Sequence, residues 1–238
     1  MRGDVMAEPT PRLKQVASLV PRGTVVADIG TDHALLPMYL VREGVCPRVI
    51  ATEVADGPLR LAGANLASFP WRERVELRRG DGLSVLAPGE ADAVVLAGMG
   101  GNTMRAMLTA APAVLAAGPL LILQPMNGER RLRQWLYEHD RYIVAERLVR
   151  ERGRLYVVMA AVPGRAPLPD LLALTVGPRL IENRDPLLPV HLERLAGRLE
   201  VLRRSLAGAR GPVPRAGEVD TLLGEIREVR RCLFGEKT

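Results

Sequence analysis

Residues 25–33 read Val-Val-Ala-Asp-Ile-Gly-Thr-Asp-His, and residues 35–37 continue with Leu-Leu-Pro. An apolar run stops here at an acid, a glycine, a second acid and a histidine. A buried parallel strand ends in this way when its carboxyl end holds a ligand. Residues 94–101, Val-Val-Leu-Ala-Gly-Met-Gly-Gly, give a second ending of this kind. Two such endings predict an open α/β sheet with a site across its carboxyl edge.

Short apolar segments alternate with amphipathic ones along the first two thirds of the chain. This alternation is typical of an α/β fold. We expect strands at residues 24–29, 47–54, 74–78, 92–97, 120–124, 142–148 and 155–162. We expect helices at residues 10–20, 35–43, 57–69, 101–116 and 129–138.

The pattern changes after residues 163–169, which contain three prolines. Leucines then recur at alternating spacings of four and three from Leu188 to Leu206, and a second apolar seam runs from Val219 to Leu233. Such seams are typical of coiled coils. The break at residues 208–217 contains two prolines, which favours an antiparallel hairpin over an intermolecular coiled coil. We therefore expect two domains, residues 1–164 and 165–238.

The 238-residue chain carries a net charge of +6, and its only lysines are Lys14 and Lys237. Arginine pairs well with phosphate, so a nucleic-acid partner is one interpretation and general solubility is the other. The charge is concentrated in residues 130–154, where eight arginines face four acids. Aromatic residues make up only 3% of the chain, which disfavours a base-stacking platform of the single-strand-binding type.

Two further features of the composition exclude whole classes of protein. No apolar run approaches the ~18 residues of a membrane span, and no apolar signal region opens the chain, so we expect a cytoplasmic protein without a membrane segment. Cys46 and Cys232 form no close-spaced motif, so we expect neither a disulfide framework nor a metal site. The leucine seams are compatible with a monomer or with a weak dimer.

Acids at successive strand ends indicate the ligand. The first strand ends in Asp28-x-Gly30 without the three glycines that hold a dinucleotide pyrophosphate, and Asp32 stands in their place. Carboxylates repel a pyrophosphate and attract a cation, which favours S-adenosylmethionine over NAD. Glu53 ends the second strand, where an acid accepts ribose hydroxyls, and Asp81 follows the third, where it can accept from an adenine amino group.

Each of these residues also has a structural interpretation. Asp28 can cap a helix, Glu53 and Asp81 can be surface acids, and His33 can be a packing residue. Residues 98–101 can be a plain strand-to-helix turn, because glycine pairs are common there.

Several strings together resemble one family. They are residues 27–37 (Ala-Asp-Ile-Gly-Thr-Asp-His-Ala-Leu-Leu-Pro), 56–58 (Asp-Gly-Pro), 80–83 (Gly-Asp-Gly-Leu), 97–101 (Ala-Gly-Met-Gly-Gly), 123–125 (Leu-Gln-Pro) and 133–136 (Arg-Gln-Trp-Leu). The chain resembles the bacterial tRNA (adenine-22-N1)-methyltransferase family, TrmK, densely over residues 10–162 and more loosely beyond. The resemblance implies a Rossmann-like class I methyltransferase domain, a C-terminal coiled-coil helical hairpin, S-adenosylmethionine as cofactor and tRNA as partner.

The resemblance, together with the strand-end motif and the basic stretch at residues 130–154, predicts three sets of site residues. The catalytic residue is Asp32. The cofactor-binding residues are Asp28, Gly30, His33, Glu53, Asp81, Gly82 and Gly98. The substrate-binding residues are Met99, Gly100, Gly101, Arg130, Arg131 and Arg133.

The sequence departs from the family's pattern at Thr31, Leu35 and Met126, and the last two concern the walls of the base pocket. Methylation of another RNA site or of a small molecule stays open as an alternative. So does a non-catalytic RNA-binding module.

Overall fold

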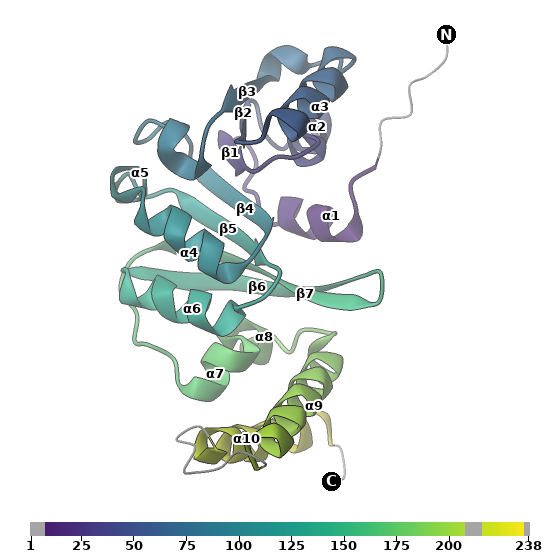
Figure 1. Cartoon of the computed structure of the whole chain (residues 1–238), viewed down its shortest axis with the longest axis vertical. Coiled ribbons are helices and arrows are strands. Elements are labelled where there is room, and N and C mark those ends of the chain that lie inside the picture. Colours follow the sequence, from purple (N-terminus) through teal and green to yellow (C-terminus); the bar gives the residue numbers. More distant parts are fainter. Residues whose placement is uncertain (1–7, 208–215, 236–238) are drawn as a thin grey trace. The chain divides into compact units, whose positions relative to one another are not determined.

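Seven strands form one sheet in the order β3-β2-β1-β4-β5-β7-β6 in the computed structural model, which describes residues 8–207 and 216–235 (Figure 1). β1 to β5 are parallel, and β7 is antiparallel to both of its neighbours. The strands are β1 (Val26–Ile29), β2 (Val49–Glu53), β3 (Val75–Arg79), β4 (Ala93–Met99), β5 (Leu120–Pro125), β6 (Arg141–Glu151) and β7 (Arg154–Pro163). All seven predicted strands are present, and the α/β class is confirmed.

The strand order reverses at β1. From β1 the chain moves outward through β2 to β3 and then returns to place β4 on the other side of β1. Connections leave β1 and β4 in opposite directions along the sheet, so the carboxyl ends of these strands flank a crevice. This switch point fixes where a ligand site can form.

Helices cover both faces of the sheet. α1 (Pro11–Ala17), α2 (Leu35–Arg42) and α3 (Asp56–Ala67) share an apolar cluster with one face. α4 (Gly101–Thr109) packs near β4, and α6 (Glu129–Glu138) packs near β6 and against α4 (Figure 1). Every residue of β1 and β2 is buried, which explains why both strands read as nearly continuous apolar runs.

Some predicted boundaries were wrong. The predicted helix at residues 101–116 is two helices, because α5 (Pro112–Ala116) begins at a proline that cannot continue α4. The helix predicted to reach residue 20 ends at Ala17, where two tighter turns close it. Two short 3₁₀ turns, η1 (Arg72–Arg74) and η2 (Gly82–Val85), flank β3 and were not predicted.

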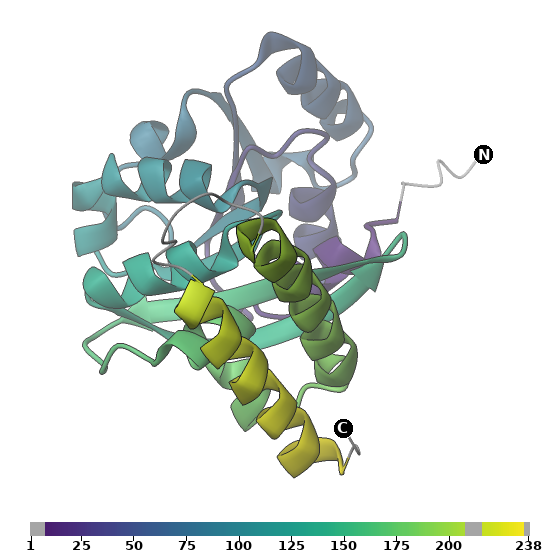
Figure 2. The same cartoon turned by 60° about the horizontal axis from the view of Figure 1, so that its bottom comes forward.

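A second compact unit begins at Pro167. It contains α7 (Leu171–Val176), α8 (Pro178–Glu182), α9 (Leu188–Ala207) and α10 (Ala216–Phe234), and α9 lies beside α10 as a helical hairpin (Figure 2). Most of the predicted break at residues 208–217 lies outside the described residues.

The apolar seam of this hairpin is only partly as predicted. Leu188 and Leu192 are fully buried, whereas Leu202 is 42% exposed. Leu223, which lies off the predicted seam, is buried. The reason is that α7 contacts both long helices, so they bury a wider face than a two-helix coiled coil does.

Within residues 8–207 and 216–235, no helix is long and apolar enough to cross a bilayer. No group of three or more histidine, cysteine or acidic side chains in the same ranges could hold a metal ion.

Candidate active site

A cavity of about 470 Å³ lies at the carboxyl ends of β1, β2, β3 and β4. The predicted cofactor and catalytic residues all line it: Asp28, Gly30, Asp32, His33, Glu53, Asp81, Gly82 and Gly98. Met99 lines it too. The switch point of the sheet therefore gathers side chains that are far apart in the sequence.

The loop after β1, residues 30–34, has an unusual backbone. Gly30, Asp32 and Ala34 have φ values of 71°, 54° and 57°, in the left-handed region that residues with a Cβ avoid. The amides of Gly30 and Thr31 both donate to the carbonyl of Thr52 at 2.9 Å, which holds the loop against β2. Strain that is held in place in this manner is common at functional sites.

Asp32 occupies the most exposed part of this loop. Its side chain is 64% exposed, and one carboxylate oxygen lies 3.3 Å from Nε2 of His33. Its amide donates to Oε2 of Glu53 at 3.2 Å. The backbone is thus fixed while the carboxylate stays accessible to a molecule in the cavity.

Glu53 connects the loops around it. Only 8% of Glu53 is exposed, and its Oε1 accepts hydrogen bonds from the amides of Val54 and Ala55 at 2.9 and 3.0 Å. Its carbonyl accepts from the amide of Gly80 at 3.0 Å, at the start of the loop after β3. Each carboxylate oxygen has two lone pairs, so Glu53 retains acceptor capacity toward hydroxyl groups in the cavity.

Asp28 lies deepest. Burial raises the pKa of its carboxyl to about 6, repulsion from Glu53 adds to the rise, and the Thr31 hydroxyl partly offsets it. A buried carboxylate with this pKa is stabilised by any cationic group that enters the cavity. Asp28 is not a simple surface cap, because only 5% of the residue is exposed.

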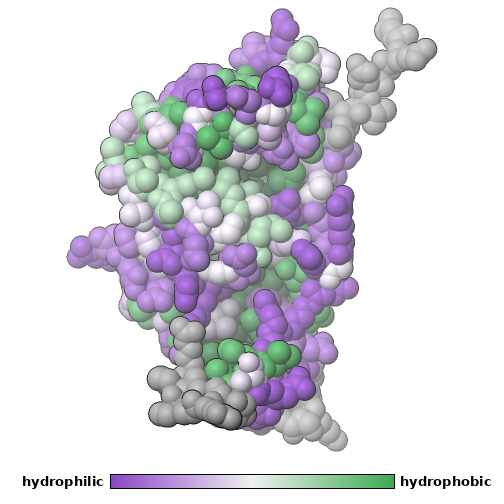
Figure 3. Space-filling view, in the orientation of Figure 1, coloured by the Kyte–Doolittle hydropathy of each residue, from purple (hydrophilic) through white to green (hydrophobic). Residues whose placement is uncertain are grey.

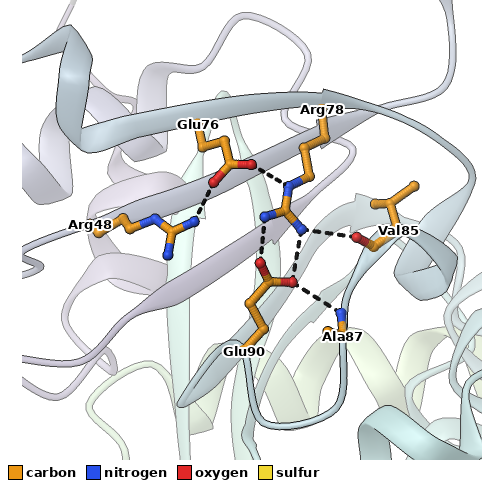
Figure 4. A network of polar contacts seen from close by, with 6 residues as sticks. All are labelled: Arg48, Glu76, Arg78, Val85, Ala87 and Glu90. Carbon is orange, nitrogen blue, oxygen red and sulfur yellow. Dashed lines mark hydrogen bonds and ion pairs between the residues drawn. The ribbon is translucent and has the colours of Figure 1, made fainter.

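The loop after β3 is held by an ion-pair network (Figure 4). Nη1 of Arg78 donates to the Val85 carbonyl at 2.9 Å and to Glu90 at 2.8 Å, and Nε donates to Glu76 at 2.7 Å. Glu90 accepts from the Ala87 amide at 3.0 Å. These contacts lower the pKa of Glu90 to about 2, with the Arg78 hydrogen bonds as the largest cause. The network encloses the turn that begins with Asp81 and Gly82.

The loop after β4 forms the remaining wall. Gly98 has a φ of 79°, and its amide donates to Oε1 of Gln124 at 3.0 Å. The terminal methyl of Met99 reaches Gly30, where an added Cβ would lie 2.4 Å from it. Gly30 therefore lets the first and fourth strand ends approach each other closely.

Gly101 requires a correction. The residue is buried, its amide donates to the Asn127 carbonyl at 2.9 Å, and an added Cβ would lie 2.8 Å from that oxygen. Its lack of a side chain serves the packing of α4 on the loop before α6, so it is not positioned to bind a substrate. Neither Gly100 nor Gly101 lines the cavity.

Arg133 was also predicted wrongly. Its side chain is fully buried, and Nε lies 2.7 Å from Oε1 of Glu146, which is equally buried. A buried and paired guanidinium cannot reach phosphate. Arg141, counted in the same basic stretch, is 4% exposed and donates to two backbone carbonyls. Arg131 is exposed and Arg130 is half-buried, and neither lines the cavity.

Sequence reasoning missed several lining residues. Arg12 and Leu13 enter from α1, and Thr103 and Met107 enter from α4. Nη1 of Arg12 donates to the same Gln124 oxygen that accepts from Gly98. A sequence signal for this part of the wall was available in Gln124, a polar residue that ends the apolar strand β5 and is fully buried.

Comparisons with known proteins agree with this geometry. A methyltransferase-domain family model matches residues 10–159. The tRNA (adenine(22)-N(1))-methyltransferase of Bacillus subtilis is 38% identical over 179 residues, which is 73% of this chain and 75% of that protein. The chain belongs to the tRNA (adenine(22)-N(1))-methyltransferase family.

Two solved structures are similar to this chain over more than nine tenths of its length. The crystal structure of the B. subtilis m1A22 tRNA methyltransferase TrmK has a TM-score of 0.83 at 29% identity, covering 93% of this chain and 98% of its own. Sp1610 of Streptococcus pneumoniae, solved in complex with S-adenosyl-L-methionine, has a TM-score of 0.81 at 30% identity, covering 92% and 97%.

The residues of this cavity fit S-adenosylmethionine, the cofactor of this methyltransferase. The buried carboxylate of Asp28 suits an ammonium or sulfonium group, since its charged form is otherwise penalised. Three backbone amides already donate to the Glu53 carboxylate, so one lone pair, on Oε2, remains for a ribose hydroxyl. Gly30, whose missing side chain leaves room for the methyl of Met99, presents only backbone to the cavity at this point. A pyrophosphate would instead face four carboxylates, those of Asp28, Asp32, Glu53 and Asp81.

Proposed function

We propose that this protein methylates N1 of adenine 22 in tRNA with S-adenosylmethionine as the methyl donor. The observation that carries the proposal is Asp32, an exposed carboxylate on a strained, hydrogen-bonded loop within the cofactor cavity. The membership of the family gives the reaction its expected acceptor. Since tRNA is the substrate, we place the reaction in the cytoplasm.

The bound cofactor supplies an electrophilic methyl group on a sulfonium. Adenine N1 has a free lone pair, so no base has to deprotonate it before attack. The protein contributes alignment, an effect that can supply roughly 7–11 kcal/mol of a barrier. Asp32 stabilises the positive charge that develops on the adenine ring, or accepts a proton from its amino group. Because N1 lies on the pairing edge, the adenine must be unpaired or flipped.

The remaining site residues take the following roles in this proposal. Asp28, Gly30, His33, Glu53, Asp81, Gly82 and Gly98 bind the cofactor, and their common position in one cavity supports this. Met99 contacts the target base, supported by its place in the cavity wall beside Gly30, and Gly100 contacts it from just outside this wall. Arg130 and Arg131 contact tRNA, supported by their incomplete burial.

The helical hairpin is a further candidate for tRNA contact. α9 carries Arg194, Arg198, Arg203 and Arg204 at exposed positions. On α10, Arg227 is paired with Glu200 at 3.0 Å, which reduces what it offers to phosphate. A helix with its apolar residues turned inward and arginines outward suits a polyanionic partner.

The test uses the full-length protein, S-adenosylmethionine with a labelled methyl group and unmodified tRNA. We expect one labelled nucleoside, 1-methyladenosine at position 22. The matched control is the same tRNA with guanine at position 22, because guanine N1 carries a hydrogen and has no free lone pair. Label at another position or in a small molecule would support a different substrate. Cofactor binding without any transfer would support a non-catalytic RNA-binding module.

A further inference from the structure

The β6–β7 hairpin projects past the edge of the sheet that carries the cavity (Figure 1). β7 is antiparallel to β5 and β6 is antiparallel to β7, so β6 runs in the direction of the parallel strands. Its carboxyl end therefore lies at the same edge as the ends of β1 to β5. The turn of the hairpin and the cavity therefore lie at the same edge of the sheet, the one where the parallel strands end.

The register gives the length of this projection. Leu123 of β5 pairs with Met159, which places Pro125, the last residue of β5, level with Val157. Val157 pairs with Leu148 of β6. Residues 149–152 thus extend beyond the end of β5, and at ~3.3 Å per residue the projection is about 13 Å long. We call residues 149–156 the arm.

The tip of the arm carries three exposed arginines, Arg150, Arg152 and Arg154. In the ranges 8–207 and 216–235, no salt bridge to any of them is found. The single acid of the arm, Glu151, faces inward instead: its side chain is 12% exposed and accepts from the Arg12 amide at 2.9 Å. Figure 3 shows hydrophilic residues at the right-hand edge, where Figure 1 places the hairpin.

The turn itself shows an unusual choice of residue. Arg152 and Gly153 join the strands with φ values of 47° and 75°. A two-residue hairpin turn with both φ values positive is normally built from Asn-Gly or Gly-Gly. An arginine at this position has a strained backbone that Asn or Gly would relieve. Its presence despite the strain indicates that a positive charge at the tip has a function.

The arm is joined to the cavity by hydrogen bonds that begin at Glu151, next to its turn. Glu151 holds the N-terminus of α1 through the Arg12 amide, and Arg12 reaches Gln124 with its guanidinium. Gln124 in turn accepts from the amide of Gly98 in the β4 turn. The arm is therefore attached to the wall where the target base is expected.

We propose that the arm is a docking surface for the RNA phosphates that flank the methylated nucleotide. The proposal rests on the proposed function, since a tRNA strand must pass the cavity mouth to present adenine N1. Arginine forks bind phosphate oxygens in pairs, and such contacts position a nucleic acid without reading its sequence. The charge, the projection beyond the catalytic edge and the attachment to the β4 turn fit this partner.

The test compares two triple variants of the full-length protein with the same change in charge. The arm variant is Arg150→Gln, Arg152→Gln and Arg154→Gln. The control variant is Arg60→Gln, Arg72→Gln and Arg74→Gln, which changes three exposed arginines of α3 and η1. The tRNA Kd, the kcat and KM for tRNA, and the cofactor Kd are measured for each at several salt concentrations.

We expect the arm variant to raise the KM and Kd for tRNA roughly tenfold or more and to reduce the slope of log Kd against log salt by about 2–3. The control variant should change the KM, the Kd and the salt dependence for tRNA by less than the arm variant does. Both triple variants should bind the cofactor like the parent protein. Equal effects of the two triple variants would overturn the proposal, as would a loss confined to kcat. If the parent binds tRNA without methylating it, the proposed function fails while the binding comparison still judges the arm.

A single change, Arg152→Gly, tests the tip separately. Glycine relieves the left-handed strain, so the melting temperature should stay level or rise while tRNA affinity falls severalfold. A variant that keeps full tRNA affinity at every salt concentration would contradict the role of the tip.

Discussion

The two loops that line the cavity from β1 and β3 are held in different ways. The β1 loop, residues 30–34, has three left-handed positions and is fixed by backbone amides that donate to the Thr52 carbonyl and the Glu53 side chain. The β3 loop, residues 80–90, is fixed mainly by side chains, with Arg78 and Glu90 at its centre (Figure 4). Glu53 contacts both, through its carboxylate and its carbonyl.

This difference corresponds to the role that we propose for each loop. A strained backbone with direct main-chain hydrogen bonds fixes the point from which the exposed Asp32 carboxylate projects, and the charge stabilisation that we propose for it depends on such a fixed position. An ion-pair network near the edge of the sheet has more freedom, since its partly exposed charges are screened by water. We expect changes in the first loop to affect the chemical step and changes in the second to affect cofactor affinity.

Replacement of Asp32, the proposed catalytic carboxylate, should have the largest effect. Asp32→Asn should lower kcat about 10²-fold or more, because an interaction made mainly in the transition state is lost. Cofactor affinity, measured by calorimetry, should stay close to that of the parent. Asp56→Asn is the matched control, since Asp56 is similarly exposed but follows β2 and pairs with Arg79. Loss of cofactor binding in Asp32→Asn would make this residue a ligand contact instead.

The pH dependence of cofactor binding tests the buried acid of the first strand. Asp28 has a pKa of about 6 in the free protein, and it must ionise to pair with a cationic group. Affinity should therefore weaken as the pH falls below 6, by about tenfold at pH 5 relative to pH 8. Asp28→Asn should bind weakly and without this pH dependence. A wild-type affinity that is flat between pH 5 and 8 would contradict the pairing.

The same residue should limit stability. The folded-state pKa of Asp28 is raised from 3.8 to about 6, so the folded protein disfavours the charged form above pH 6. This penalty fades as the pH falls through 6 and is absent below about 4. Asp28→Asn should raise the free energy of unfolding at pH 7.5 by an amount on the order of 3 kcal/mol. Denaturant titrations at pH 7.5 and pH 4 measure this change in the free energy of unfolding. An equal increase at the two pH values would mean that the ionisation of Asp28 is not its cause.

The sequence predicted the fold and the cavity acids because both depend on local signals. Buried parallel strands read as apolar runs, and the residues directly after them meet at one edge of the sheet. Asp28, Glu53 and Asp81 could be placed together from their positions at strand ends alone. The strand count and the two long C-terminal helices follow from the same reasoning.

Contacts between distant segments could not be predicted in this way. Arg12 and Gln124 are 112 residues apart, and nothing in either neighbourhood indicates that they meet. Arg133 was taken as a surface charge because composition counts charges without showing which are buried. Its partner, Glu146, lies on the next strand along the chain, and the pair is visible only once α6 is packed against β6.

The smallest effect should come from the β3 network. Arg78→Gln removes the donors to Val85 and Glu90 and should loosen the turn that carries Asp81. We expect the KM for the cofactor to rise roughly fivefold, equivalent to about 1 kcal/mol, with kcat within about twofold of the parent. Arg48→Gln is the matched control within the same network, because Arg48 contacts only Glu76 among the six residues of Figure 4. If Arg48→Gln raised the KM for the cofactor by the same factor, the cause would be the loss of a positive charge at this edge of the sheet and not the loss of the contacts to Val85 and Glu90. If Arg78→Gln lowered kcat as Asp32→Asn does, the two loops would act as one unit, joined through Glu53, and the division between them would be wrong.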